Sequence, residues 1–294
     1  MRKFISAMIL GASVLGVSFG ATAKAPVVVE MFGMNGCGAD MMVQDSVFEL
    51  LRKHEDVIFV NCRKKIDIGN GDPEMKYTHD FCNERSAEYA RRLSYFGEKT
   101  PMVVVNGKWE AYYSDLDPSV KVGTTDNVQN IDLSIQGDVI NISVPEIEGV
   151  DKGVLFIYSY APTQGDETLV VDPDVSLTDD IQKRLAAGQS VPFVTKERLV
   201  PYFVRPIVNR VRVADWHGGV FQTSYPLSYL IEMDQGMVND LSYVAVLHKG
   251  DDYGAIVAAG EVMAPAEKNS ILLHSKAPEI ELRSNPNPEV INSQ

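Results

Sequence analysis

The residues most able to take part in a chemical reaction are three cysteines, Cys37, Cys62 and Cys82, in a chain of 294 residues. Cys37 follows a β-favouring run, Val27 to Glu30, and precedes apolar residues at helical spacing. A cysteine at the start of a helix feels the positive end of the helix dipole, which favours the reactive thiolate. The sequence therefore predicts a reactive thiol at Cys37. The alternative is that Cys37 is a remnant of the fold with no reaction to perform.

Asp40 stands where a Cys-x-x-Cys motif would carry its second cysteine. Its carboxylate, one turn into the helix, is expected near the Cys37 sulfur, where it would oppose the helix dipole. We therefore expect a thiol only mildly more acidic than an ordinary cysteine. The second thiol of Cys-x-x-Cys normally resolves the mixed disulfide made by the first. Without it, a complete redox cycle needs Cys62, Cys82 or a thiol from another molecule.

Cys62 follows a second apolar run, Val57 to Val60, and Cys82 lies at the start of the next predicted helix. If the two strands pair, Cys62 reaches the same edge of the sheet as Cys37. A structural Cys62–Cys82 disulfide would close a loop of about 20 residues and contribute about 3 kcal/mol of stability. We favour this pairing over one that uses Cys37, and the odd number of cysteines leaves one thiol unpaired within the chain.

Several methionines are close to Cys37 in the sequence, and they suggest a second hypothesis, a metal site. Thiolate and thioether sulfur are soft ligands that suit Cu(I), so Met34, Cys37 and Met102 form a candidate copper site. The competing interpretation is packing, because methionine is a common filler of hydrophobic cores. The remaining methionines of the cluster are Met31, Met41 and Met42.

The elements around these residues follow a recognisable order. After the first strand and helix come the strand Val57 to Val60, a helix from Thr78 to Phe96, and a strand that opens with Thr100-Pro101. Asn106-Gly107 then predicts a hairpin. This order is typical of a thioredoxin-like domain, in which the proline is cis and lies against the cysteine. Thr100 and Pro101 therefore join Cys37 and Asp40 as candidate site residues.

The second half of the chain has a different sequence pattern, in which short apolar runs alternate with predicted turns. About seven such strands predict an all-β, sandwich-like domain. We expect a signal peptide over 1–23, the thioredoxin-like domain over 24–125, the β domain over 126–265 and a flexible tail over 266–294. The predicted strands are 131–135, 139–144, 154–160, 199–213, 221–225, 243–248 and 255–262, with an inserted helix at 178–187.

The N-terminus predicts export. Arg2 and Lys3 precede a mostly apolar run, and Ala21-Thr22-Ala23 has the small residues of a cleavage site. We therefore expect a periplasmic or secreted protein with no stable membrane insertion after cleavage, since no later stretch could span a bilayer. The formal charge of −13 argues against nucleic acid as a partner.

Several segments resemble the secreted, thioredoxin-like family known as domain of unknown function 1223, whose pattern begins V-V-E-L-F-T-S-Q-G-C-S-S-C. The resemblance spans about Val27 to Val262. Asp40 replaces the second cysteine of the pattern, Met102 replaces a glutamine after the proline, and residues 161–196 form an insertion. The matching segments are Val28 to Cys37, Phe81, Arg85, Tyr89, Ala90, Thr100-Pro101, Val104 to Gly107, Val208, Trp216, Gly218, Gly254 to Ile256 and Ala258-Ala259.

The resemblance implies a periplasmic protein with a thioredoxin-like half and a β half, and it supplies no activity. Combined with the residues, it leads us to expect thiol–disulfide exchange or thiol-mediated binding at Cys37, with protein thiols or an extended peptide as partner. No cofactor is expected unless the copper reading holds. The alternative function is a redox-inactive module in which the backbone before Pro101 binds an extended peptide.

Overall fold

The computed structural model describes residues 24–34, 38–65, 77–93, 97–112, 115–171, 196–231, 241–264 and 280–281. The expected signal peptide, Cys37 and the expected helix at 178–187 lie outside these residues. The described elements, in chain order, are β1 (Val27–Gly33), α1 (Gly38–Lys53), β2 (Val57–Lys64), β3 (Thr78–His79), α2 (Asp80–Leu93), β4 (Met102–Val105), β5 (Trp109–Ala111), α3 (Leu116–Gly123), the short 3-10 helix Thr124–Asp126, β6 (Gln129–Asn130), β7 (Asp132–Gln136), β8 (Val139–Val144), β9 (Gly153–Tyr160), β10 (Gln164–Val171), β11 (Lys196–Phe203), β12 (Ile207–Trp216), β13 (Phe221–Pro226), the 3-10 helix Leu227–Leu230, β14 (Ser242–Lys249), β15 (Ile256–Val262) and β16 (Ile280–Glu281).

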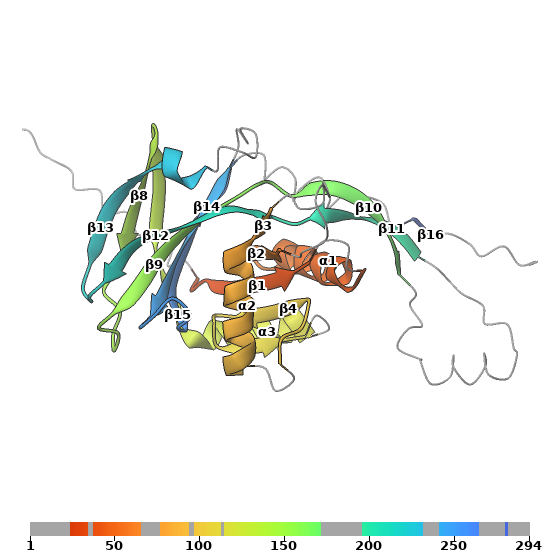
Figure 1. The fold of residues 1–294 in the computed structure, drawn as a ribbon, viewed down its shortest axis with the longest axis horizontal. Helices are drawn as coiled ribbons and strands as arrows, with labels where there is room; N and C mark the ends of the chain where they lie inside the picture. Colours follow the sequence, from red (N-terminus) through yellow and green to blue (C-terminus); the bar gives the residue numbers. More distant parts are fainter. Residues whose placement is uncertain are drawn as a thin grey trace, which may run out of the picture.

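The N-terminal half is a mixed α/β unit built on a sheet in the order β3-β2-β1-β4-β5 (Figure 1). β1 and β2 are parallel, whereas β4 is antiparallel to β1 and pairs with β5 as a hairpin. β1 is buried along its whole length, because helices cover both faces of the sheet. Val27, Val29 and Met31 pack with residues of α1 and α3, and Val28 and Phe32 point to the side of α2.

The C-terminal half is β-rich. One sheet has the order β12-β9-β14-β15-β6 and a smaller one has the order β13-β8-β7. A hydrophobic cluster that includes Ile142, Ile157 and Trp216 lies between them. β9 is buried throughout because it is an inner strand of the larger sheet, which lies between the smaller sheet and the α/β unit. Its odd-numbered side chains face the smaller sheet, and Phe156 and Tyr158 face the α/β unit.

The two halves share one continuous core. A single cluster joins Phe32 of β1, Tyr89 of α2, Phe156 of β9 and Val246 of β14. Consequently, polar side chains on the α2 side of β1 are enclosed between two sheets, far from bulk solvent. A third sheet, β10-β11-β16, leaves the β-rich half and passes over α1 (Figure 1).

The predicted strand over 199–213 is wrong as a single element, because β11 ends at Phe203 and β12 begins at Ile207. Arg205 has a left-handed φ of 46° between them, and Pro206, which has no N–H, cannot extend the ladder of β11. The junction is held by hydrogen bonds with side chains that are distant in the sequence. The Val204 N–H donates to Gln44 Oε1, and Asn61 Nδ2 donates to the Val204 carbonyl.

Other predicted boundaries also shift. The helix expected over Thr78 to Phe96 begins at Asp80, because Thr78–His79 pair with β2, and it is described to Leu93. The short helix α3 was not predicted; Pro118 within its first turn weakens its apolar pattern. Ile280–Glu281, inside the segment expected to be a flexible tail, pair with β11.

Candidate functional site

The elements that flank Cys37 meet at the end of β1. β1 stops at Gly33 and α1 is described from Gly38, so residues 35–37 lie between them, outside the described part of the chain. Phe32 pairs with Met102 of β4, which places the start of β4 beside the end of β1. The Thr100–Pro101 bond immediately before it is cis, as predicted.

The Asp40 carboxylate turns into the protein. Asp40 and Arg63 of β2 are each only 1% exposed and form an ion pair. The same carboxylate accepts hydrogen bonds from the Met34 N–H at 3.2 Å and from Gln44 Nε2 at 3.0 Å. It therefore links the end of β1, the first turns of α1 and β2 into one rigid corner.

The alternation of β2 explains why Arg63 is the partner. Phe59 and Arg63 point to the α1 side of the sheet, while Val60 and Cys62 point to the α2 side. Gly33 lies opposite Arg63, and a Cβ atom there would overlap Asp40 Oδ1 and Arg63 Nη1. The corner thus requires glycine at position 33 because the ion pair occupies the space of a side chain.

The charge of the corner is balanced. Burial raises the pKa of Asp40, and the neighbouring Arg63 guanidinium partly opposes this rise. Because Arg63 compensates the carboxylate, the pair adds little net negative potential at the start of α1. The opposition to the helix dipole that we expected from Asp40 is therefore largely offset. Arg63 was missed in the sequence because nothing local marks its partner.

Cys62 and Cys82 form a disulfide with a Cα–Cα distance of 5.4 Å, which confirms the predicted pairing. Both cysteines are buried, between β2 and α2. The bridge faces the opposite side of the sheet from Arg63, since residues 62 and 63 alternate. It also occupies both thiols that could have resolved a mixed disulfide at Cys37.

The two methionines of the proposed copper site have different environments. Met102 is 1% exposed and packs with Phe32 in the shared core. Met34 is half-buried after the end of β1. Packing accounts for Met102, and within the described ranges no group of three or more His, Cys, Asp or Glu side chains could hold a metal ion. The copper site of Met34, Cys37 and Met102 stays a prediction, since Cys37 lies outside those ranges.

A second polar cluster, not predicted as a site, is buried in the shared core. Arg85 of α2 donates from Nε to Glu30 at 2.8 Å, from Nη2 to the Tyr89 hydroxyl at 2.8 Å, and from Nη1 to the Asp252 carbonyl at 2.8 Å. The Tyr89 hydroxyl donates to the second Glu30 oxygen at 2.7 Å. His248 Nε2 lies 3.1 Å from Arg85 Nη2. We call Glu30, Arg85, Tyr89 and His248 the core network.

The hydrogen bonds of the core network define the state of His248. Its Nδ1 lies 2.9 Å from the Gly254 carbonyl, which can only accept, so Nδ1 carries the proton. Nε2 then accepts from Arg85. Burial lowers the pKa of His248 well below its usual value, and the positive charge of Arg85 lowers it further. The imidazole is therefore neutral, and Arg85 is the cation that compensates Glu30.

This neutral histidine predicts a pH dependence of stability. Below about pH 6.5 the unfolded chain takes up a proton on residue 248 and the folded chain does not, so the free energy of unfolding should fall as pH decreases. The slope from one such group is at most about 1.4 kcal/mol per pH unit. His248→Gln, which cannot titrate, should show a shallower decline than the wild type between pH 6.5 and 5 in urea unfolding. Equal slopes for the two proteins would refute this assignment.

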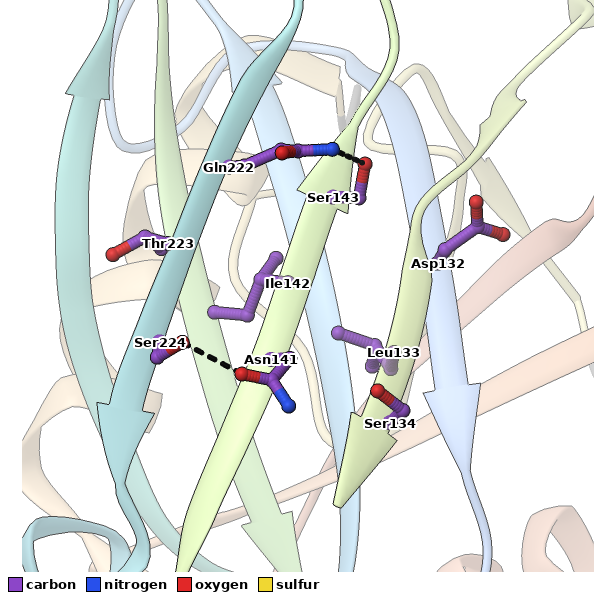
Figure 2. A pocket seen from close by; sticks show the side chains of 9 residues that line it. All are labelled: Asp132, Leu133, Ser134, Asn141, Ile142, Ser143, Gln222, Thr223 and Ser224. Atoms are coloured by element: carbon purple, nitrogen blue, oxygen red, sulfur yellow. Dashed lines mark hydrogen bonds between the residues drawn. The ribbon is translucent and has the colours of Figure 1, made fainter. Parts of the chain in front are cut away.

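A shallow polar hollow of about 420 Å³ lies on the outer face of β7, β8 and β13 (Figure 2). Its outward side chains hydrogen-bond across strands: the Ser224 hydroxyl donates to Asn141 Oδ1 at 2.6 Å, and Gln222 Nε2 donates to Ser143 at 3.4 Å. Such pairing is that of a solvent-facing sheet surface. We therefore assign no chemistry to this face.

No helix in the described residues is long and apolar enough to cross a membrane. No family model matches the chain, and no curated protein matches it. Among solved structures, the chain is similar to the crystal structure of an Agrobacterium tumefaciens protein determined as a structural-genomics target. The two share 18% identity and a TM-score of 0.55, over 83% of this chain and 96% of that chain. At this identity the similarity is one of fold, and it extends over both the α/β half and the β-rich half.

Proposed function

We propose that this protein is an exported, thioredoxin-like protein whose Cys37 forms mixed disulfides with thiols of partner proteins or small molecules. The observation that carries the proposal is the buried Cys62–Cys82 disulfide. Since the chain has three cysteines, this bridge leaves Cys37 as the one available for exchange. A disulfide inside the core is a poor target for an attacking thiolate, because attack requires access to a sulfur atom.

The topology supports the thioredoxin-like assignment. The order β2-β1-β4-β5, with β4 antiparallel to its neighbours, α1 and α3 on one face and α2 on the other, is the arrangement expected of that fold. Cys37 precedes α1 and Pro101 precedes β4, the two positions that carry the cysteine and the proline in this fold. Membership in the family known as domain of unknown function 1223 belongs to the same proposal. So does a sandwich-like arrangement for the β-rich half.

The compartment and the local electrostatics are consistent with this function. A structural disulfide suits an oxidising compartment, and the N-terminal segment has the composition of an export signal. The Asp40–Arg63 pair is close to neutral overall, which leaves the helix dipole as the main influence at the start of α1. This dipole favours thiolate.

Oxidised glutathione tests the proposal. Folded wild-type protein should gain one glutathione per chain, mapped to Cys37 by mass spectrometry, and Cys37→Ser should gain none. The reaction with glutathione should stop at one equivalent. In a separate assay the protein should not reduce insulin disulfides through repeated turnovers, because the chain supplies no resolving thiol. If folded protein stays unmodified while urea-unfolded protein reacts at Cys37, thiol exchange is refuted. The peptide-binding and copper readings would then take its place.

A further inference from the structure

Within the described residues, three buried hydrogen-bond donors on one face of the middle sheet have no hydrogen-bond partner. Two are Nε and Nη2 of Arg210 on β12, and the third is the hydroxyl of Tyr158 on β9. Tyr158 is only 1% exposed. Arg210 and Tyr158 are directly paired in the antiparallel ladder, so their side chains leave the sheet side by side. Buried donors without acceptors are costly, so three together need an explanation.

The arrangement follows from a bulge in β12. The register shifts between Ile207 and Asn209, and this shift sets Arg210 opposite Tyr158. Because Tyr158 faces the α/β unit, Arg210 faces it too. β12 is an edge strand of its sheet, and Arg210 as a whole is half-buried. The guanidinium thus lies at the margin of the shared core.

Aromatic stacking accounts for the faces of the Arg210 guanidinium and not for its edge. Its Cζ lies 3.8 Å from the centroid of the Phe156 ring and 5.6 Å from that of Phe81. The centroid of the Tyr158 ring is 5.9 Å away, and cation–π contacts of this kind stabilise the charge of the group without providing an acceptor for its N–H bonds. The Nε–H bond and one Nη2–H bond lie in the plane of the guanidinium group and point in the same direction. They form a fork that matches two oxygens of one oxyanion.

The positive charge of Arg210 also lacks an ion-pair partner in the part of the chain that the structure describes. No acidic side chain of the described chain forms an ion pair with it. Glu30, the buried carboxylate of the core network, is already bound by Arg85 and Tyr89. Arg212, two residues further along the same strand, differs because it pairs with Asp215 at 2.5 Å. The buried edge of the Arg210 guanidinium, Nε and Nη2, thus has neither a hydrogen-bond acceptor nor an ion-pair partner among the described residues, and such groups are normally paired.

We propose that the Arg210 fork and the Tyr158 hydroxyl bind a small oxyanion, a carboxylate or a phosphate, at the margin of the shared core. Two parallel N–H groups hold the two oxygens, and the tyrosine hydroxyl donates a third hydrogen bond. The rings of Phe156 and Phe81 contact the guanidinium through cation–π interactions and help to hold it in place. This site is independent of Cys37.

Thermal unfolding with acetate or inorganic phosphate as the probe tests the site, with chloride at matched ionic strength as the reference. Wild-type protein should show a saturable rise in Tm with acetate or phosphate above the chloride reference. Arg210→Gln should lose the saturable part, whereas the general stabilisation by phosphate should remain in every variant. Arg212→Gln is the matched control and should respond like the wild type. A wild type without a saturable rise, or an Arg210→Gln variant that retains it, would overturn the proposal.

Two conservative variants keep the test decisive if Arg210→Gln unfolds. Tyr158→Phe removes only an unpartnered hydroxyl, so without a probe its Tm should equal or exceed that of the wild type. Its affinity for acetate should fall about tenfold, the effect of one hydrogen bond to a charged group. Arg210→Lys keeps the charge but lacks the fork, and it should lose at least as much affinity. Wild-type affinity in both variants would show that neither the fork nor the hydroxyl binds the anion.

Discussion

Replacing Arg85 by methionine is expected to lower the free energy of unfolding by about 3–5 kcal/mol, the usual cost of removing one partner of a buried ion pair. Arg85 is 1% exposed and makes hydrogen bonds to Glu30, Tyr89 and the Asp252 carbonyl. Without it, the Glu30 carboxylate would be a buried charge with one hydrogen bond left, from Tyr89. Urea unfolding at pH 7, followed by circular dichroism, measures the loss.

Two control variants distinguish the cost of leaving Glu30 without its cation from the effect of replacing any arginine of α2 by methionine. Arg91→Met changes an arginine on the same helix whose side chain is 71% exposed, and it should have almost no effect. The double variant Glu30→Leu/Arg85→Met removes both charges and should recover much of the stability lost by Arg85→Met. If the double variant is as unstable as Arg85→Met, the cost comes from packing and not from an uncompensated Glu30.

Removal of the Cys62–Cys82 disulfide, by the double variant Cys62→Ser/Cys82→Ser, should lower the free energy of unfolding by about 3 kcal/mol. The bridge spans 20 residues, so its loss increases the conformational entropy of the unfolded chain. Cys37→Ser should leave stability almost unchanged. The comparison is made by urea unfolding without reductant, and the wild type with reductant should resemble the double variant.

This experiment also tests how the disulfide and Cys37 are related. If the bridge is only structural, the double variant should still form its glutathione adduct at Cys37 under conditions in which it is folded. Loss of that adduct in a folded double variant would show that the bridge takes part in the chemistry of Cys37. Unchanged stability of the double variant would contradict the structural role of the bridge.

Local patterns in the sequence were enough to predict the main elements. The β-favouring run Val27 to Glu30 and the short apolar run Val139 to Val144 predicted strands because β-branched and other apolar residues favour that conformation. Asn106-Gly107 predicted the hairpin because this pair favours a tight turn, and the entry of Thr100-Pro101 into a Val-rich strand before that hairpin predicted the cis bond. The Cys62–Cys82 bridge was predicted because both cysteines belong to neighbouring elements.

The partners of buried polar residues were decided by the tertiary structure alone. Glu30 looked like one residue of a strand. Only the packing of the β-rich half against α2 placed His248 beside Arg85, although 163 positions separate the two residues in the sequence. Asp40 looked like a residue of a helix start, and Arg63 became its partner through the register of β2 with β1. The break between β11 and β12 has local causes in Arg205 and Pro206, but the side chains that bond to it, Gln44 and Asn61, come from distant elements. Local propensity depends on a few neighbouring residues, whereas a buried charge requires a partner that the chain can supply from any distance.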